Sequence, residues 1–181
     1  MATTNQQART VNPSTSKVGD VSSLILLAVL LAAGFILNFT LGNALAIVGI
    51  KPQFIIAAYS LAILLSGAGP AQAVIYGLIS AAVIQFTTSI PGLNFFTESV
   101  SALLMSFLVA RKVGGDKLYP LVCTFLTTLL SGALFAVCGT LIMGAALPTV
   151  LVKVPLVLGT AVFNAVVVQA LTPALRKVLK R

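Results

Sequence analysis

The chain has 181 residues, of which 59% are hydrophobic and only 8% are charged, and it contains no histidine and no tryptophan. Because soluble domains carry about 25% charged residues, this composition excludes an ordinary soluble protein and indicates one membrane-embedded domain. Eleven Lys and Arg side chains outnumber three acidic ones, but the cations lie outside the apolar segments and form no continuous basic face. Nucleic acid is therefore not an expected partner.

The first twenty residues are polar and rich in Ser, Thr and Asn. They offer no apolar face to pack, so residues 1–20 are predicted to form a disordered cytoplasmic tail. A signal peptide is not indicated, because the first apolar run starts after residue 20 and no small-residue cleavage pattern follows it.

Six apolar segments follow, and they predict an all-α integral membrane protein with six transmembrane helices in one domain, residues 21–175. The segments are expected at 22–39, 54–65, 71–86, 95–110, 119–143 and 154–171. A spanning helix needs about 20 apolar residues, so the second and third segments are short. Joined as one helix they would extend about 50 Å, well beyond a hydrocarbon core of about 30 Å. The sequence "SGAGP" between them therefore predicts a turn.

The distribution of cations predicts the orientation in the membrane. With six spans and a cytoplasmic N-terminus, the outer side holds only Lys51 and Lys153. The inner side then holds nine cations: Arg9, Lys17, Arg111, Lys112, Lys117, Arg176, Lys177, Lys180 and Arg181. Cytoplasmic loops carry an excess of Lys and Arg, so both termini are expected in the cytoplasm of a bacterial cell. Residues 176–181 are then a basic cytoplasmic tail, and the chain is a multi-pass protein of the plasma membrane in contact with its lipid.

One polar stretch, "FTTSIPGLNFFTES" at 86–99, interrupts the apolar sequence. It carries the hydroxyls of Thr87, Thr88 and Thr97, the amide of Asn94, a Pro-Gly turn signal, and Glu98, the only acidic residue predicted on the outer side. Irregular backbone at membrane depth is tolerated only where protein or a water-filled cavity covers it. The stretch is interpreted as a binding loop, with an ordinary connector as the alternative.

Further candidates for ligand contact are the two predicted outer lysines and one amide. Lys51 and Lys153 each lie within two residues of a proline. In the functional interpretation, both lie beside one outward cavity, where either would donate a hydrogen bond to a ligand. The alternative is that both extend their ammonium groups to the lipid headgroups. Asn164 lies in the sixth segment, where it either bonds a neighbouring helix or contacts the ligand.

Catalysis has no support in the sequence. Histidine is absent, and there are no paired carboxylates, no cluster of metal ligands and no phosphate-binding glycine loop. We therefore expect neither an enzyme nor a cofactor. The carboxylate relays of proton-coupled carriers are also missing, so transport would need another source of energy. In the first segment, Ala28 and Ala32 lie four residues apart with Gly34 nearby, forming a small-residue strip that another helix can approach closely.

Together these features resemble the substrate-binding S component of an energy-coupling factor (ECF) transporter. The resemblance implies six helices, cytoplasmic termini and an Ala-x-x-x-Ala motif, here Ala28 to Ala32, that docks on a transmembrane T component. It also implies two ATPase subunits that supply the energy, and a small-molecule substrate.

A finer likeness is to the tryptophan-type S components, in which Lys-Pro-Asp opens the second helix and Thr-Thr-x-x-Pro-Gly precedes Asn-x-x-Asp-Lys. This chain has Lys51-Pro52-Gln53, then "TTSIPG" at 87–92 and "NFFTE" at 94–98. Gln53 replaces the aspartate, and Thr97-Glu98 replaces Asp-Lys. The expected substrate-binding residues are Lys51, Gln53, Thr87, Thr88, Asn94, Thr97, Glu98, Lys153 and Asn164.

These departures alter the counter-charge that the ammonium group of an amino acid needs. The favoured substrate at this point is therefore a vitamin-class micronutrient, cobalamin in particular, whose amides suit a mouth lined by neutral amides and hydroxyls. The alternatives are a tryptophan-type uptake protein, a stand-alone secondary transporter of a small hydrophobic metabolite, and a membrane scaffold without transport activity.

Overall fold

The computed structural model describes residues 21–46 and 52–179, and within these residues the protein is all-helical, as the composition predicts. The elements are α1 (Val21–Leu37), the π-helix η1 (Asn38–Gly42), α2 (Asn43–Ala46), α3 (Phe54–Ser66), α4 (Pro70–Ile84), α5 (Leu93–Ala110), α6 (Gly115–Ile142) and α7 (Thr149–Leu179). Among the described helices, four are long and apolar enough to cross a membrane: α1 continued by η1, α5, α6 and α7. Six spans remain a prediction.

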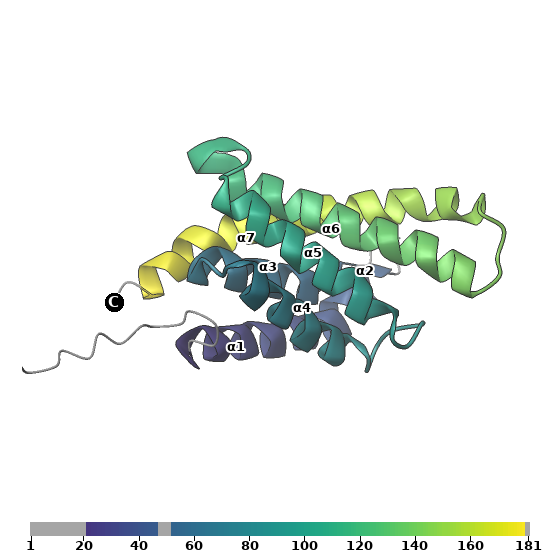
Figure 1. The fold of residues 1–181 in the computed structure, drawn as a ribbon, viewed down its shortest axis with the longest axis horizontal. Coiled ribbons are helices and arrows are strands. Elements are labelled where there is room, and N and C mark those ends of the chain that lie inside the picture. Colours follow the sequence, from purple (N-terminus) through teal and green to yellow (C-terminus); the bar gives the residue numbers. More distant parts are fainter. Residues whose placement is uncertain (1–20, 47–51, 180–181) are drawn as a thin grey trace, which may run out of the picture.

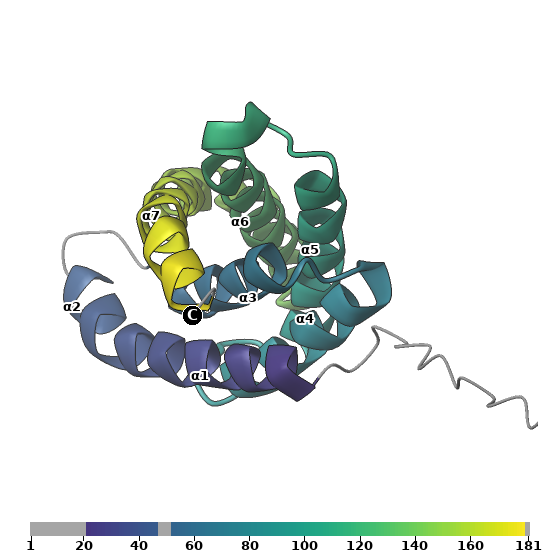
Figure 2. The same ribbon diagram turned by 90° about the vertical axis from the view of Figure 1, so that its left-hand side faces the viewer.

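Helix α3 is the centre of the bundle. Seen along the bundle in Figure 2, it is ringed by α1, α4, α5, α6 and α7, and every side chain from Phe54 to Leu64 is buried. A helix that is apolar on all sides is stable when it is enclosed in this way. Its 13 residues extend only about 20 Å. Because other helices enclose it, its length need not match the thickness of the hydrocarbon core.

The turn between α3 and α4 has the predicted form. Gly67 ends α3 with φ of 64°, and its N–H donates to the carbonyl oxygen of Ile63 at 3.0 Å. Glycine adopts this left-handed conformation without a steric penalty. Pro70 then starts α4 at a position where its missing N–H costs nothing. The prediction of two short helices joined by a turn is confirmed.

Several predicted helix ends are wrong. Helix α6 begins at Gly115 and α7 at Thr149, where we expected starts at 119 and 154. Helix α5 begins at Leu93, two residues before the expected start at 95. Asn94 therefore lies in its first turn and Glu98 in its second, although the whole stretch 86–99 was interpreted as a binding loop.

Helix α7 continues through Pro173 to Leu179, whereas we expected it to end before the proline. Proline is tolerated inside a membrane helix, and the hydroxyl of Thr172, the residue before it, donates to the carbonyl oxygen of Val168 at 2.6 Å.

Two glycines allow close helix packing that positions the later site. A Cβ atom on Gly77 of α4 would lie 2.7 Å from the carbonyl oxygen of Glu98 and 2.8 Å from Cα of Ser99 in α5. A Cβ atom on Gly34 of α1 would lie 3.0 Å from the carbonyl oxygen of Phe54 in α3. The backbone that carries Glu98 therefore rests directly on α4.

The two ends of the bundle differ in charge. Figure 1 shows the start of α1, the end of α7 and the α5–α6 connection at one end, and the α4–α5 and α6–α7 connections at the other. The first end carries five described cations: Arg111, Lys112, Lys117, Arg176 and Lys177. The second end carries one, Lys153. We call these the cationic end and the cavity end.

Candidate functional site

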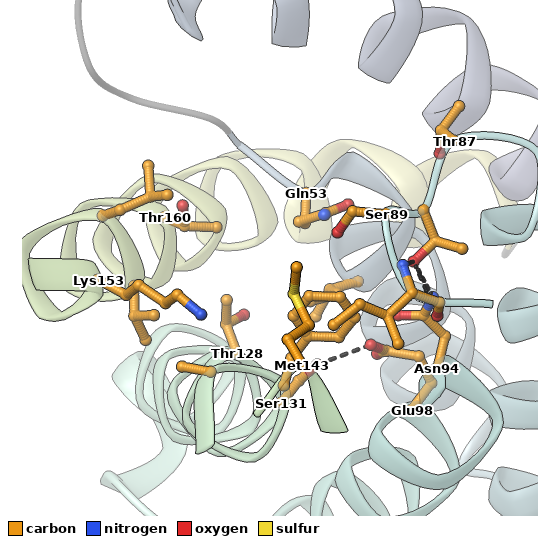
Figure 3. A pocket seen from close by; sticks show the side chains of 18 residues that line it. Gln53, Thr87, Ser89, Asn94, Glu98, Thr128, Ser131, Met143, Lys153 and Thr160 are labelled. Carbon is orange, nitrogen blue, oxygen red and sulfur yellow. Dashed lines mark hydrogen bonds between the residues drawn. The ribbon is translucent and has the colours of Figure 1, made fainter. Parts of the chain in front are cut away.

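A cavity of about 350 Å³ opens at the cavity end. It lies between the residues preceding α3, the α4–α5 connection, and helices α5, α6 and α7, and Figure 3 shows its side chains. Its polar lining consists of Gln53, Thr87, Thr88, Ser89, Asn94, Glu98, Thr128, Ser131, Lys153 and Thr160.

The structure gathers six of the nine residues expected to bind substrate at this cavity. These are Gln53, Thr87, Thr88, Asn94, Glu98 and Lys153. Thr97 and Asn164 are buried and do not line the cavity themselves. Each donates a hydrogen bond to a residue that does: Thr97 to Glu98, and Asn164 to Gln53. Lys51 lies outside the described residues.

Glu98 is the buried acidic group of the site. It is 2% exposed, and its Oε1 accepts hydrogen bonds from the hydroxyls of Ser131 at 2.7 Å and Thr97 at 3.3 Å. Its Oε2 accepts a hydrogen bond from the hydroxyl of Tyr59, on the central helix α3, at 3.0 Å. Three elements therefore hold this carboxyl group in one orientation, and no described Lys or Arg forms an ion pair with it.

Lys153 is the cation of the site. It lies in the second turn of α7, is half-buried, and extends its ammonium group into the cavity (Figure 3). Nζ donates to the hydroxyl of Thr140 in α6 at 3.0 Å, and Thr140 in turn donates to the carbonyl oxygen of Ala136 at 2.7 Å. The one ion pair among the described residues joins Lys112 to Asp116 at 2.7 Å, so Lys153 also faces the cavity without a partner carboxylate.

Hydrogen bonds fix the α4–α5 connection over the cavity. The amide of Asn94 donates to the hydroxyl of Thr88 at 2.7 Å (Figure 3). The N–H of Gly92, which has φ of 86°, donates to Oε1 of Gln85 at 2.9 Å. Side chains on both sides of the connection therefore hold it closed on itself, which makes it a pre-formed wall of the cavity.

Two buried amide oxygens at the site lack a hydrogen-bond partner. They are Oε1 of Gln53, which lines the cavity, and Oδ1 of Asn164. The Nδ2 group of Asn164 donates to the backbone carbonyl of Gln53 at 3.1 Å, and this bond fixes the segment that leads into α3. Buried polar groups in folded proteins are nearly always bonded, so Gln53 Oε1 is an acceptor available to a ligand.

Sequence reasoning missed the wall contributed by α6 and the apolar residues that α7 adds to it. Thr128, Ser131 and Phe135 lie on one face of α6, at spacings of three and four residues, and Leu156 and Val157 of α7 complete an apolar surface. The signal in the sequence was the helical spacing of the two hydroxyls. It was weak, because Ser and Thr in a helix usually bond their own backbone.

A second cavity of about 240 Å³ adjoins the first. Gln53, Thr87 and Thr88 line both, and Asn38 and Phe39 of η1 line the second. These three shared residues form the partition between the cavities. The described residues contain no group of three His, Cys, Asp or Glu side chains that could hold a metal ion.

Comparison with known families shows which family the chain belongs to. The family model described as "Tryptophan transporter TrpP" matches residues 20–180. No curated protein and no solved structure shows a significant match. The match covers nearly the whole chain and agrees with the tryptophan-type likeness of "KPQ", "TTSIPG" and "NFFTE". The chain therefore belongs to the tryptophan transporter TrpP family, a family of ECF-type S components.

Proposed function

We propose that this protein is the substrate-binding subunit of an ECF-type importer and that its substrate is tryptophan. The observation that carries the proposal is a cavity that combines an apolar wall with a few fixed polar groups, in a chain of this family. Such a combination is typical of small-molecule sites. The family match favours the tryptophan alternative over our cobalamin reading.

The size of the cavity supports the same choice. Its volume of about 350 Å³ lies near the lower end of the range of about 300–1,000 Å³ found for ligand sites. An amino acid with a bicyclic side chain suits this volume, whereas a corrinoid with its nucleotide loop is several times larger. The cobalamin reading followed from the altered counter-charge in the sequence. Glu98 lines the cavity, and this supports tryptophan because its carboxyl group can supply that counter-charge.

Gln53 and the apolar wall of the cavity together offer the contacts that an indole ring needs. Phe135, Leu156 and Val157 offer apolar surface for the ring, and an indole N–H is a donor that needs an acceptor when it is buried. Oε1 of Gln53 is a buried acceptor without a partner at the same cavity. Phenylalanine has no such donor, and Gln53 would then stay unsatisfied.

The charge difference between the ends supports an orientation in which the cavity opens outward. The five described cations of the cationic end would lie on the cytoplasmic side, which follows the positive-inside rule. In this arrangement α3 and α4 are the second and third of six membrane helices, both termini are cytoplasmic, and the cavity meets substrate outside the bacterial plasma membrane. An importer's capture subunit needs its site on that side.

Helix α1 is the proposed docking surface for the T component. Ala28 and Ala32 are both exposed on α1, whereas Gly34 is buried against α3. The two alanines therefore form a strip that another membrane helix can approach closely, and Gly34 serves the internal packing. Two ATPase subunits bound to the T component would supply the energy.

We predict that Ala32→Phe prevents co-purification of the T component and the ATPase subunits, because the larger side chain blocks close helix approach. Ala33→Phe is the matched control, since Ala33 is also exposed on α1 but faces another direction. Tryptophan binding by the isolated subunit should be unchanged in both variants. Equal loss of the complex in the two variants would contradict this docking strip.

Reconstitution in liposomes separates the proposed function from a stand-alone transporter. We expect uptake of labelled tryptophan only when the chain is combined with the T component, the two ATPase subunits and ATP. The chain alone should bind tryptophan without accumulating it. Uptake by the chain alone, driven by an ion gradient, would refute the S-component proposal.

A further inference from the structure

We propose that the cavity recognises both charged groups of a zwitterionic amino acid, with Lys153 binding the α-carboxylate and Glu98 binding the α-ammonium. This inference rests on the proposed function and adds to it the orientation of the substrate and the chemical groups that it must carry. The argument starts from the hydrogen bonds that each residue leaves unused.

Lys153 has donors to spare for a carboxylate. An ammonium group carries three N–H donors, and the structure assigns one of them to the hydroxyl of Thr140 at 3.0 Å. Thr140 is itself 1% exposed and bonded to Ala136, so it holds the lysine in place from α6. The other two N–H groups remain available on the side of the cavity, where Lys153 is drawn in Figure 3.

Glu98 has acceptor capacity to spare for an ammonium group. A carboxylate offers about four lone-pair positions, and the hydroxyls of Tyr59, Thr97 and Ser131 occupy three. All three partners are neutral, so they orient the carboxylate without neutralising its charge. The remaining position belongs to Oε2, which has one partner where Oε1 has two.

The two charges are separate from each other. Glu98 and Lys153 line the same cavity but do not form an ion pair, and Figure 3 shows them on opposite sides of it. A charge inside a membrane protein is costly unless it is paired, and an ionisable residue at that depth usually marks a functional site. A zwitterion neutralises both at once, whereas a ligand with one charge leaves the other unpaired.

Three indole compounds test the assignment with one readout. L-Tryptophan carries both charges, tryptamine lacks the carboxylate, and indole-3-propionate lacks the ammonium. Because the chain contains no tryptophan, fluorescence excited beyond the tyrosine band reports only the ligand. In the detergent-solubilised chain we expect tryptamine and indole-3-propionate to bind at least tenfold more weakly than L-tryptophan.

Two variants then assign each group. Lys153→Met should weaken L-tryptophan at least tenfold and leave tryptamine unchanged, because tryptamine offers nothing to the lysine. Glu98→Gln should weaken L-tryptophan at least tenfold and leave indole-3-propionate unchanged. Lys177→Met, an exposed lysine at the cationic end, is the matched control and should change no affinity. The ratio of two Kd values within one variant does not depend on how much of it is folded.

Each outcome decides the assignment. If both analogues bind as tightly as L-tryptophan, recognition of the two charges is wrong and the proposed function stands. If Lys153→Met weakens tryptamine as much as L-tryptophan, Lys153 does not bind the carboxylate. If none of the three indole compounds binds the parent chain, the proposed function and this inference both fail.

Discussion

The cavity end and the cationic end use their charged side chains in opposite ways. At the cationic end, Lys112 pairs with exposed Asp116 at 2.7 Å, and Arg176 bonds the Tyr119 hydroxyl and packs over its ring. At the cavity end, Lys153 and Glu98 are held by neutral hydroxyls and face a common cavity without pairing.

This comparison distinguishes exposed charges, which orient a protein in the membrane, from buried charges without a counter-ion, which are suited to bind a ligand. Exposed cations and ion pairs contribute little to stability, and at a membrane surface they set orientation. Charges that are buried, oriented by neutral groups and left without a counter-ion are costly in isolation. We propose that in this protein a ligand offsets that cost by supplying both counter-charges, which is why we place function at the cavity end.

The largest expected effect concerns the close packing behind Glu98. Gly77→Ala places a methyl group 2.7 Å from the carbonyl oxygen of Glu98, so α4 and α5 must separate. We expect a loss of about 1–3 kcal/mol in stability, together with weaker tryptophan binding. Thermal unfolding in detergent, followed by circular dichroism, measures the first, and the ligand titration measures the second.

Gly159→Ala is the control for that substitution. Gly159 lies in α7 with ordinary helical φ, and a Cβ atom there meets nothing within 4 Å. Alanine is the better helix former, so the melting temperature should be unchanged or slightly higher. If the two alanine variants behave alike, close packing of α4 on α5 does not position Glu98.

A smaller effect is expected from removing the free acceptor at the cavity. Gln53→Met keeps the length of the side chain but removes the oxygen that we assign to the indole N–H. One hydrogen bond contributes about 0.5–1.5 kcal/mol, so tryptophan affinity should fall several-fold and phenylalanine affinity should not. Competition between the two amino acids measures the ratio directly, and an unchanged ratio would exclude Gln53 as the indole acceptor.

The smallest effect is expected at the cationic end. Lys112→Ala removes the ion pair with Asp116, whose side chains are 63% and 80% exposed. Water and salt screen such a pair, so neither the melting temperature nor the tryptophan affinity should change measurably. A large loss of tryptophan affinity in this variant would contradict the claim that charges at the cationic end take no part in binding.

The sequence was sufficient for the class of protein, the apolar segments and much of the lining of the candidate cavity. Helical apolar runs locate the helices, and Gly67 and Pro70 mark the turn between α3 and α4. The stretch 86–99 was interpreted as a binding loop, but from Leu93 onward it is the start of α5, where Asn94, Thr97 and Glu98 are buried. Their polarity serves the interior of the site, which only the tertiary structure shows.

The remaining errors also have physical causes. Pro173 was expected to end α7, but the helix continues through it to Leu179, as membrane helices can where neighbouring groups satisfy the backbone that proline frees. Thr128 and Ser131 lie in a long apolar run where a hydroxyl commonly bonds its own helix, so no sequence signal separates a cavity wall from ordinary packing. Helix α6 reaches the cavity only because it packs against α5 and α7.

The most direct test of the central claim is a fluorescence titration of L-tryptophan with the purified chain, which has three tyrosines and no tryptophan of its own. We predict a saturable blue shift of the ligand's emission as the indole ring leaves water for the apolar wall. The shift should be lost when Lys153→Met and Glu98→Gln are combined, and retained in Lys177→Met. No saturable shift would contradict tryptophan binding by this chain, and an equal shift in the combined variant would contradict recognition of the two tryptophan charges at this cavity.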